Sequence, residues 1–245
     1  MQNSRVPLWP GNRKLAVSLT YDGAYAEHLD VVEPLLEHFG VHGTFYLHPT
    51  RVLENVQGWQ RIAERGHEIG NGSLLGVADD GRLPNWTLRM VEQDLHMTQE
   101  FIQNVFESSE CVSFVYPGGE PVCAQGSYQG LVAEAFQNAR GRTHGENGPD
   151  CDLLDLRWEQ MDSMTVSQFK DWKQDLTGRL ELRDPTPSWR IFRFGQMFSG
   201  EHHGSLLTHE LIVTHLADRR EDIWIAPIHE VADCIRNTRS ELEPQ

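Results

Sequence analysis

Apolar and polar positions along this chain follow two alternating periods, which predict strands followed by helices. Residues 14–22, KLAVSLTYD, form a compact run of small and β-branched side chains that is typical of a strand. Residues 27–40, EHLDVVEPLLEHFG, place Leu29, Val32 and Leu36 at helical spacing, and Gly40 is a suitable C-cap. The same strand–helix order continues to the end of the chain.

The remaining elements follow from the same criteria. We expect strands at 42–49, 67–71, 113–121, 188–195 and 222–228, and helices at 55–66, 88–108, 128–141, 167–181, 207–219 and 229–241. Such alternation is typical of parallel strands joined by crossover helices. We therefore predict an α/β fold with six or seven strands in a (β/α) barrel that is incomplete or distorted. No repeat or change of composition marks a linker, so residues 1–245 are expected to form a single domain.

In barrels of this kind, the chemistry lies where the strands end at their C-terminal edge. The residues to inspect are then Tyr21 with Asp22, Leu47 with His48, Asn71 with Gly72, Tyr116 with Pro117, and Phe194 with Gly195.

Composition narrows the classes of partner. The chain has 39% hydrophobic residues but no long apolar run, and we expect a soluble, cytoplasmic protein that binds no membrane. The formal net charge is −15, from 21 basic and 36 acidic residues, which disfavours a nucleic-acid partner. The four scattered cysteines form no CxxC pair and are expected to be reduced thiols.

Four segments resemble motifs of the polysaccharide deacetylases, carbohydrate esterase family four. They are SLTYDGAYAEHLDVVEPLLEHFGVHGTFYL, GHEIGNGSLLG, FVYPGG and DIWIAPIHEVADCI, in the family's order and at plausible spacing. The resemblance covers nearly the whole chain and implies the family's barrel. It also implies hydrolysis of the C–N bond of N-acetylated sugars by a divalent cation held by one aspartate and two histidines. A second aspartate acts as base and a late histidine as acid.

This sequence departs from that pattern at the residues that would hold the metal. The first motif carries Asp22 and Gly23 in place of two aspartates, so the base is kept and the ligand is glycine. Gly72 and Gly76 stand where the family has two histidines. The late histidine aligns with Gly195, with Ser199 and His202 as other alignments. Glycine offers no side-chain donor, so we predict that the metal site is lost and that no cofactor is bound.

Three interpretations of the cleft remain open. The first, which we favour, is a degenerate member that binds a saccharide, with Tyr21, Trp86 and Tyr116 as aromatic platforms. The second is a metal-independent amide hydrolase with Asp22 as base and the N–H groups of Gly118 and Gly119 as an oxyanion hole.

The third interpretation is a rebuilt metal site of Asp22, His48, Glu201, His202 and His203. A separate alternative is a scaffold protein whose surface binds a partner. The predicted catalytic residue is Asp22.

The cleft residues that we predict share a position near a strand end or in a loop at the mouth: Tyr21, His48, Asn71, Ser73, Tyr116, Gly118, Arg140 and His202. Arg140 is expected to end a helix and to orient Asp22 or a ligand carboxylate, and His144 in the following loop could reach the cleft. The expected partner is a small saccharide or amide, and a homo-oligomer stays open.

The other histidines are not expected to serve the cleft. His67 is expected to satisfy a buried hydrogen bond. Six histidines fall on predicted helices and are expected at the surface: His28, His38, His96, His209, His215 and His229.

Overall fold

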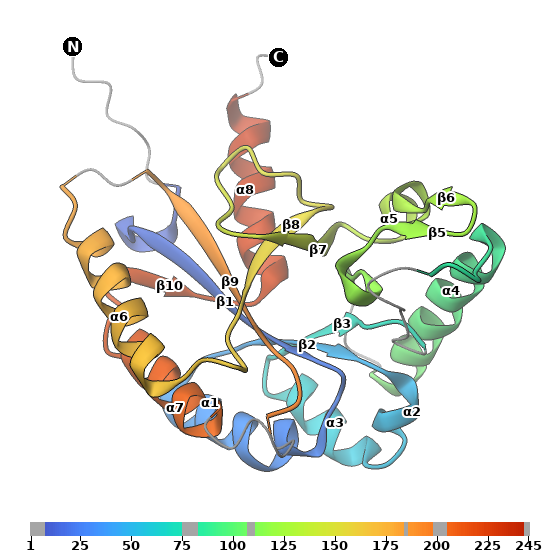
Figure 1. The fold of residues 1–245 in the computed structure, drawn as a ribbon, viewed down its shortest axis with the longest axis horizontal. Helices are drawn as coiled ribbons and strands as arrows, with labels where there is room; N and C mark the ends of the chain where they lie inside the picture. The colour runs from blue at the N-terminus through green and yellow to red at the C-terminus, as the bar shows by residue number, and fades with distance from the viewer. Residues whose placement is uncertain (1–7, 75–82, 107–110, 184–185, 198–204, 243–245) are drawn as a thin grey trace.

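The computed structural model describes residues 8–74, 83–106, 111–183, 186–197 and 205–242 (Figure 1). The strands are β1 (Leu15–Asp22), β2 (Thr44–Leu47), β3 (Glu68–Asn71), β4 (Ser113–Val115), β5 (Val122–Cys123), β6 (Gly126–Ser127), β7 (Asn138–His144), β8 (Leu156–Gln160), β9 (Ser188–Phe194) and β10 (Ile223–Ile225). The α-helices are α1 (Glu33–Phe39), α2 (Pro49–Val52), α3 (Val56–Glu64), α4 (Leu88–Val105), α5 (Gln129–Ala135), α6 (Val166–Leu180), α7 (Ser205–Ala217) and α8 (Ile228–Leu242).

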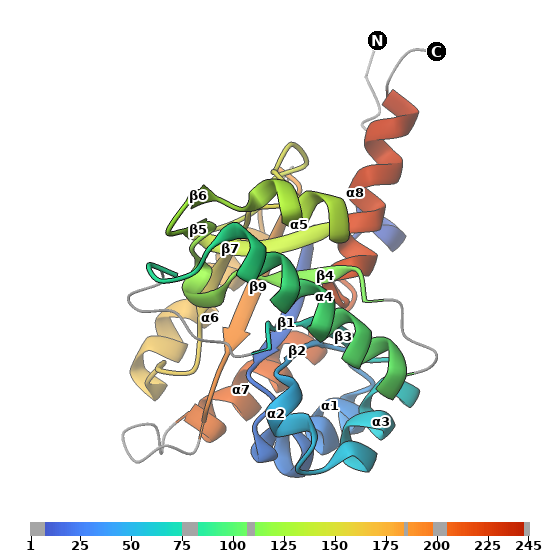
Figure 2. The ribbon, with the colours of Figure 1, turned by 90° about the vertical axis from the view of Figure 1, so that its right-hand side faces the viewer.

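Seven parallel strands close into a barrel, which confirms the predicted fold class. The ring runs β1-β2-β3-β4-β7-β8-β9 and closes by pairing of β9 with β1. β10 pairs with Leu15–Val17 of β1, whereas β2 pairs with Thr20–Asp22 further along the same strand. The helices lie around the outside of the strands, as Figures 1 and 2 show from two directions.

The two faces of β1 have different surroundings because successive side chains in a strand point to opposite sides. Leu15, Val17, Leu19 and Tyr21 belong to the apolar cluster that includes residues of the surrounding helices. Thr20 and Asp22 contact Arg140 of β7, a strand that is not adjacent to β1 in the ring. These contacts therefore cross the barrel interior.

The interior holds both polar and apolar side chains. Glu68 of β3 accepts hydrogen bonds from Thr44 of β2, from Ser113 of β4 and from the backbone N–H of His229 at the start of α8. A second apolar cluster, which includes Ala16 of β1 and Ile228 of α8, lies apart from the first. The barrel interior is thus filled with side chains rather than open.

Two strands of the ring, β7 and β8, were not expected from the sequence. The predicted helix 128–141 is wrong beyond Ala135, because residues from Asn138 onward form β7. Arg140 therefore lies within a strand and is buried, and does not end a helix. His144, predicted to lie in a loop, is the last residue of β7.

The predicted surface position of the helical histidines is wrong for three of the six. His28, His209 and His215 are buried, His229 is half-buried beside Glu68, and only His38 and His96 are exposed. The expectation for His67 is confirmed, since its buried ring accepts a hydrogen bond from the Gly43 N–H at 3.1 Å. Within the described part of the chain, no helix has the length and apolar character needed to cross a membrane.

Acid should destabilise this fold through its buried histidines. Burial lowers the pKa of His28 and of His67 to about 4, and that of His209 to about 3. The unfolded chain then binds more protons than the folded one, so stability falls as the pH drops below about 6.5 toward these values. We expect a loss of roughly 1 kcal/mol per histidine between pH 7.5 and 5.5.

Urea unfolding at the two pH values measures this loss. His96→Gln, at an exposed position on α4, should leave the difference unchanged. Equal unfolding free energies at pH 7.5 and 5.5 would contradict the prediction.

Candidate functional site

A cavity of about 180 Å³ lies at the C-terminal ends of the barrel strands. Its lining comes from five of the seven strands in the ring or the residues just after them: Asp22, Gly23, Tyr25, Tyr46, His48, Gly72, Val115, Tyr116, Pro117, Gly118 and Arg193. The place is the one predicted from the strand ends. The volume is below the roughly 300–1,000 Å³ of typical ligand pockets, so it suits a single ring or part of a larger molecule.

Asp22 is the centre of an ion-pair cluster at this cavity. Its Oδ2 atom accepts hydrogen bonds from Arg140 and, at 2.9 Å, from Nε of Arg193. Arg140 also donates to the Thr20 hydroxyl at 2.6 Å. The Arg140 side chain is only 3% exposed and that of Asp22 17%, so solvent screens these charges weakly. The predicted contact between Arg140 and Asp22 is present.

The two arginines set the protonation state of Asp22. Burial alone would raise the pKa of Asp22, but the charges of Arg140 and Arg193 and their hydrogen bonds outweigh it and hold the pKa at about 2. Asp22 is therefore a carboxylate at neutral pH and a weak proton acceptor. Its other oxygen, Oδ1, is buried and has no hydrogen-bond partner among the residues described.

Arg193 is held on two sides. Besides Asp22, it donates from Nη1 to Asp162 at 3.0 Å, and the same carboxylate oxygen accepts the Gly195 N–H at 3.0 Å. Burial alone would lower the pKa of Arg193, but Asp22 and Asp162 raise it, so the guanidinium stays charged. A Cβ atom at Gly195 would lie 2.9 Å from Nη2 of Arg193. The absence of a side chain at 195 therefore leaves room for this guanidinium.

Gly23 has a similar relation to Arg51. Arg51 donates to the Gly23 carbonyl at 2.7 Å and stacks on the Tyr25 ring, 4.1 Å from its centroid. A Cβ atom at Gly23 would lie 2.8 Å from Nη1 of Arg51, and the residue has a φ of +98°. At Gly72, a Cβ atom would lie 2.7 Å from the Leu47 carbonyl oxygen. A side chain at 23 or 72 would thus require neighbouring atoms to move.

The divalent cation that the resemblance implies needs several nitrogen or oxygen donors. Gly23 and Gly72 provide none, and the two guanidinium groups on Asp22 would repel a further cation. Across the described ranges, no group of three or more His, Cys, Asp and Glu side chains is placed to hold a metal ion. The described residues around Asp22 therefore do not fit this cation.

Several predicted residues lie outside the described ranges. They are Gly76, Ser199, Glu201, His202 and His203. The part of the rebuilt metal site that consists of Glu201, His202 and His203 therefore stays a prediction. Its remaining member, His48, lines the cavity with Asp22, and its Nδ1 lies 3.0 Å from the Ser73 carbonyl oxygen. Burial lowers the pKa of His48.

Two of the predicted aromatic platforms are placed differently. Tyr21 is wholly buried on the outer side of β1, and its hydroxyl lies 2.9 Å from Nε2 of His209, so it cannot stack on a ligand. Trp86 is half-buried against the apolar core and is not part of the cavity lining. Tyr116 does line the cavity, although it is only 1% exposed.

Asn71, Ser73 and the YPGG segment also differ from the expectation. Asn71 accepts the Ser73 N–H at 2.9 Å, and the Ser73 hydroxyl donates to Asp94, so both residues fix the turn after β3 rather than line the cavity. The Gly119 N–H donates to the Tyr116 carbonyl at 2.7 Å, which removes one of the two proposed oxyanion donors. Gly118 lines the cavity as expected.

Tyr46 and Arg193 line the cavity but were not among the residues predicted from the sequence. Arg193 sits in the strand pattern SWRIFRF, where a cation among apolar residues signals a buried carboxylate partner. Tyr46 lies two residues before His48 and on the same face of its strand, so the alternation of β2 would have predicted it. Its hydroxyl is buried and has no hydrogen-bond partner within the described residues.

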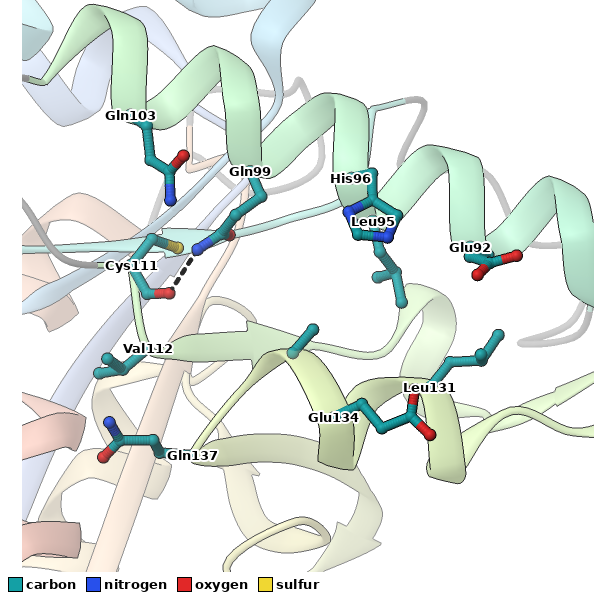
Figure 3. A pocket seen from close by; sticks show the side chains of 11 residues that line it. Glu92, Leu95, His96, Gln99, Gln103, Cys111, Val112, Leu131, Glu134 and Gln137 are labelled. Atoms are coloured by element: carbon teal, nitrogen blue, oxygen red, sulfur yellow. Dashed lines mark hydrogen bonds between the residues drawn. The ribbon is translucent and has the colours of Figure 1, made fainter.

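A second cavity, of about 510 Å³, lies on the outside of the barrel between α4 and α5 (Figure 3). Glu92, His96 and Gln99 come from α4, and Glu134 faces them from α5. Gln99 donates to the Cys111 carbonyl at 2.7 Å. This cavity is larger, but it contains none of the strand-end residues and no ion-pair cluster, so we place the functional site at Asp22.

Comparison with known proteins agrees with this fold and position. Residues 11–132 match the family model described as polysaccharide deacetylase, so this part of the chain belongs to the polysaccharide deacetylase family. A search of curated proteins gave no match.

Solved structures with the same fold span several activities. PuuE allantoinase has a TM-score of 0.71 at 11% identity, over 97% of this chain and 95% of its own. Peptidoglycan deacetylase PdaC from Bacillus subtilis has a TM-score of 0.60 at 15% identity, over 95% and 96%. A mutant of a CE4 family pseudoenzyme with restored enzymatic activity has a TM-score of 0.59 at 16% identity, over 91% and 69%. At these identities, the likeness establishes the fold alone.

Replacing Asp22 should destabilise the protein strongly. Asp22→Asn leaves Arg140 without its carboxylate, and we expect a loss of about 3 kcal/mol in urea unfolding at pH 7. Because the pKa of Asp22 is lowered to about 2, the stabilisation is present above about pH 4 and is lost as the pH falls toward 2. The matched control is Asp175→Asn, whose carboxylate is 71% exposed and lies 3.4 Å from Arg190. The control should change stability by less than about 0.5 kcal/mol; equal losses in both variants would refute the prediction.

Proposed function

We propose that this protein is a degenerate polysaccharide deacetylase that binds a saccharide at the strand-end cavity and has lost the family's metal chemistry. The observation that carries the proposal is the pairing of Asp22 with two guanidinium groups. The family's base is present, but its charge is already balanced by protein cations. A structural relative described as a CE4 family pseudoenzyme supports the idea that this fold persists without activity.

The polar groups at the cavity suit a neutral hydroxylated ligand. Oδ1 of Asp22 accepts hydrogen bonds only, Arg193 donates only, and the Tyr46 hydroxyl can do either. Oδ1 of Asp22 and the hydroxyls of Tyr46 and Tyr116 are buried without a partner in the described structure, which is costly unless a ligand or water completes them. Sugar hydroxyls both donate and accept, so they complement this set.

The metal-independent hydrolase is the weaker alternative. A general base works best when its pKa lies near the operating pH, and that of Asp22 is about 2. The Gly119 N–H, one of the two donors expected to stabilise an oxyanion, is already engaged. Both features favour binding over turnover.

Addition of a metal should not produce deacetylation. We expect zinc, cobalt or manganese to give no release of acetate from chitooligosaccharides above a reaction without protein, because Asp22 is paired with arginines. Acetate release is measured in both reactions with and without a chelator. A metal-dependent rate of acetate release that disappears in Asp22→Asn would contradict the proposal.

Removal of the Tyr46 hydroxyl should separate binding from stability. Tyr46→Phe should weaken the binding of a saccharide by about fivefold, since one hydrogen bond is worth roughly 1 kcal/mol. The unliganded protein should keep its stability or gain some, because the deleted hydroxyl has no partner in the described residues.

Tyr128→Phe is the control, since this hydroxyl donates to the Glu120 carbonyl at 2.9 Å and Tyr128 does not line the cavity. That variant should lose about 1 kcal/mol of stability and keep its affinity. Calorimetric titration with chitobiose and cellobiose measures the affinity of both variants, and urea unfolding measures their stability. Lack of binding to these and to other glycans would count against saccharide binding.

A further inference from the structure

Gly23, which lines the cavity, and Gly195, which follows β9, each have an arginine guanidinium in the space that a side chain would occupy. Nη1 of Arg51 lies 2.8 Å from a Cβ atom built at Gly23, and Nη2 of Arg193 lies 2.9 Å from one built at Gly195. The two pairs come from different elements, since Arg51 lies on α2 and Arg193 on β9. A guanidinium group therefore lies beside each of these two glycines.

Of the two arginines, only Arg193 lines the cavity. Its Nε and Nη1 atoms are bound to Asp22 and Asp162, whereas Nη2 makes no hydrogen bond among the described residues. Because a guanidinium is planar, fixing two of its nitrogens also fixes the third. The side chain is 27% exposed, so a ligand in the cavity can reach it.

We propose that Arg193 is the principal ligand-binding residue of this cavity and that Gly195 is required because it leaves room for the guanidinium. Building on the proposed saccharide function, this inference defines the group that is recognised. The ligand places an acceptor oxygen on Nη2 of Arg193. The two charges that line the cavity cancel, so a neutral sugar ring fits better than an acidic one.

Asp162 has a supporting role in this arrangement. It binds Nη1 of Arg193 and the N–H of Gly195 through one buried oxygen, so it positions both residues without lining the cavity. We expect Asp162→Asn to weaken ligand binding by moving Arg193.

The main test compares two arginines on the same strand. Arg193→Lys keeps the positive charge but loses the planar guanidinium with its several N–H donors. It should weaken the binding of N-acetylglucosamine at least tenfold, as measured by calorimetry. Arg190→Lys is the matched control, because Arg190 lies on β9, is 6% exposed and binds Glu159, but does not line the cavity. It should keep the affinity of the unmodified protein. Glucuronate, the acidic probe, should bind more weakly than N-acetylglucosamine.

A second test examines the requirement for glycine at 195. Gly195→Ala brings no positive-φ strain and should lower both the affinity and the urea midpoint by displacing Arg193. In the Arg193→Lys background the same change should have a smaller effect, because Nη2 is gone and the close contact that remains is the Asp162 oxygen, 3.1 Å from the Cβ position. Gly130→Ala, where a Cβ atom meets nothing within 4 Å, is the control; it should keep the affinity and should raise rather than lower the urea midpoint, because Gly130 lies in α5 and alanine favours a helix.

The outcomes separate this inference from the proposed function. Tight sugar binding that survives Arg193→Lys would overturn the role of Arg193 and leave saccharide binding in place. Equal effects of Gly195→Ala in both backgrounds would overturn the steric relation between Gly195 and Arg193. If N-acetylglucosamine, glucuronate and the other glycans tested all fail to bind, both proposals are overturned.

Discussion

The ion pairs of Asp22 across the barrel interior are the interaction on which the rest of this structure depends. Arg140 reaches Asp22 from β7, which does not neighbour β1 in the ring, and Arg193 reaches it from β9. Removing such charges from water costs several kcal/mol per ion, so the arrangement is stable only as a complete set. Asp162 completes the set by pairing with Arg193. The result is a strand end that is rigid and that holds a carboxylate with little capacity to accept a proton.

The Asp22 cluster and the contacts that hold the rest of the barrel involve largely different residues. The apolar layer between strands and helices and the polar contacts of Glu68 hold the rest of the barrel, and of these residues only Tyr116 lines the strand-end cavity. At the mouth of the barrel, Arg51 donates to the Gly23 carbonyl, and a Cβ atom at Gly195 would lie 2.9 Å from Nη2 of Arg193.

The sequence predicted the elements whose patterns are clear and missed those in which charges fill the barrel. β1, β2, β3 and β9 read as strands, and the strand-end motifs pointed to Asp22. β7 was missed because Arg140, Arg142 and His144 hide any apolar alternation. The prediction that Tyr21 lies in the cleft was wrong because successive side chains in a strand point to opposite faces. If Asp22 faces the barrel interior, Tyr21 must face outward. The partners of Arg193 could not be read from sequence, because Asp22 and Asp162 lie 171 and 31 residues away.

The central claim is that protein cations, and not a metal, neutralise Asp22. The most direct measurement is a crystal structure of the protein grown with excess zinc and a saccharide, with anomalous data collected at the zinc edge. The account predicts both guanidinium groups on Asp22, a sugar oxygen at Arg193, and no anomalous peak within bonding distance of the Asp22 carboxylate. A zinc peak bound to Asp22, with Arg193 displaced, would contradict it.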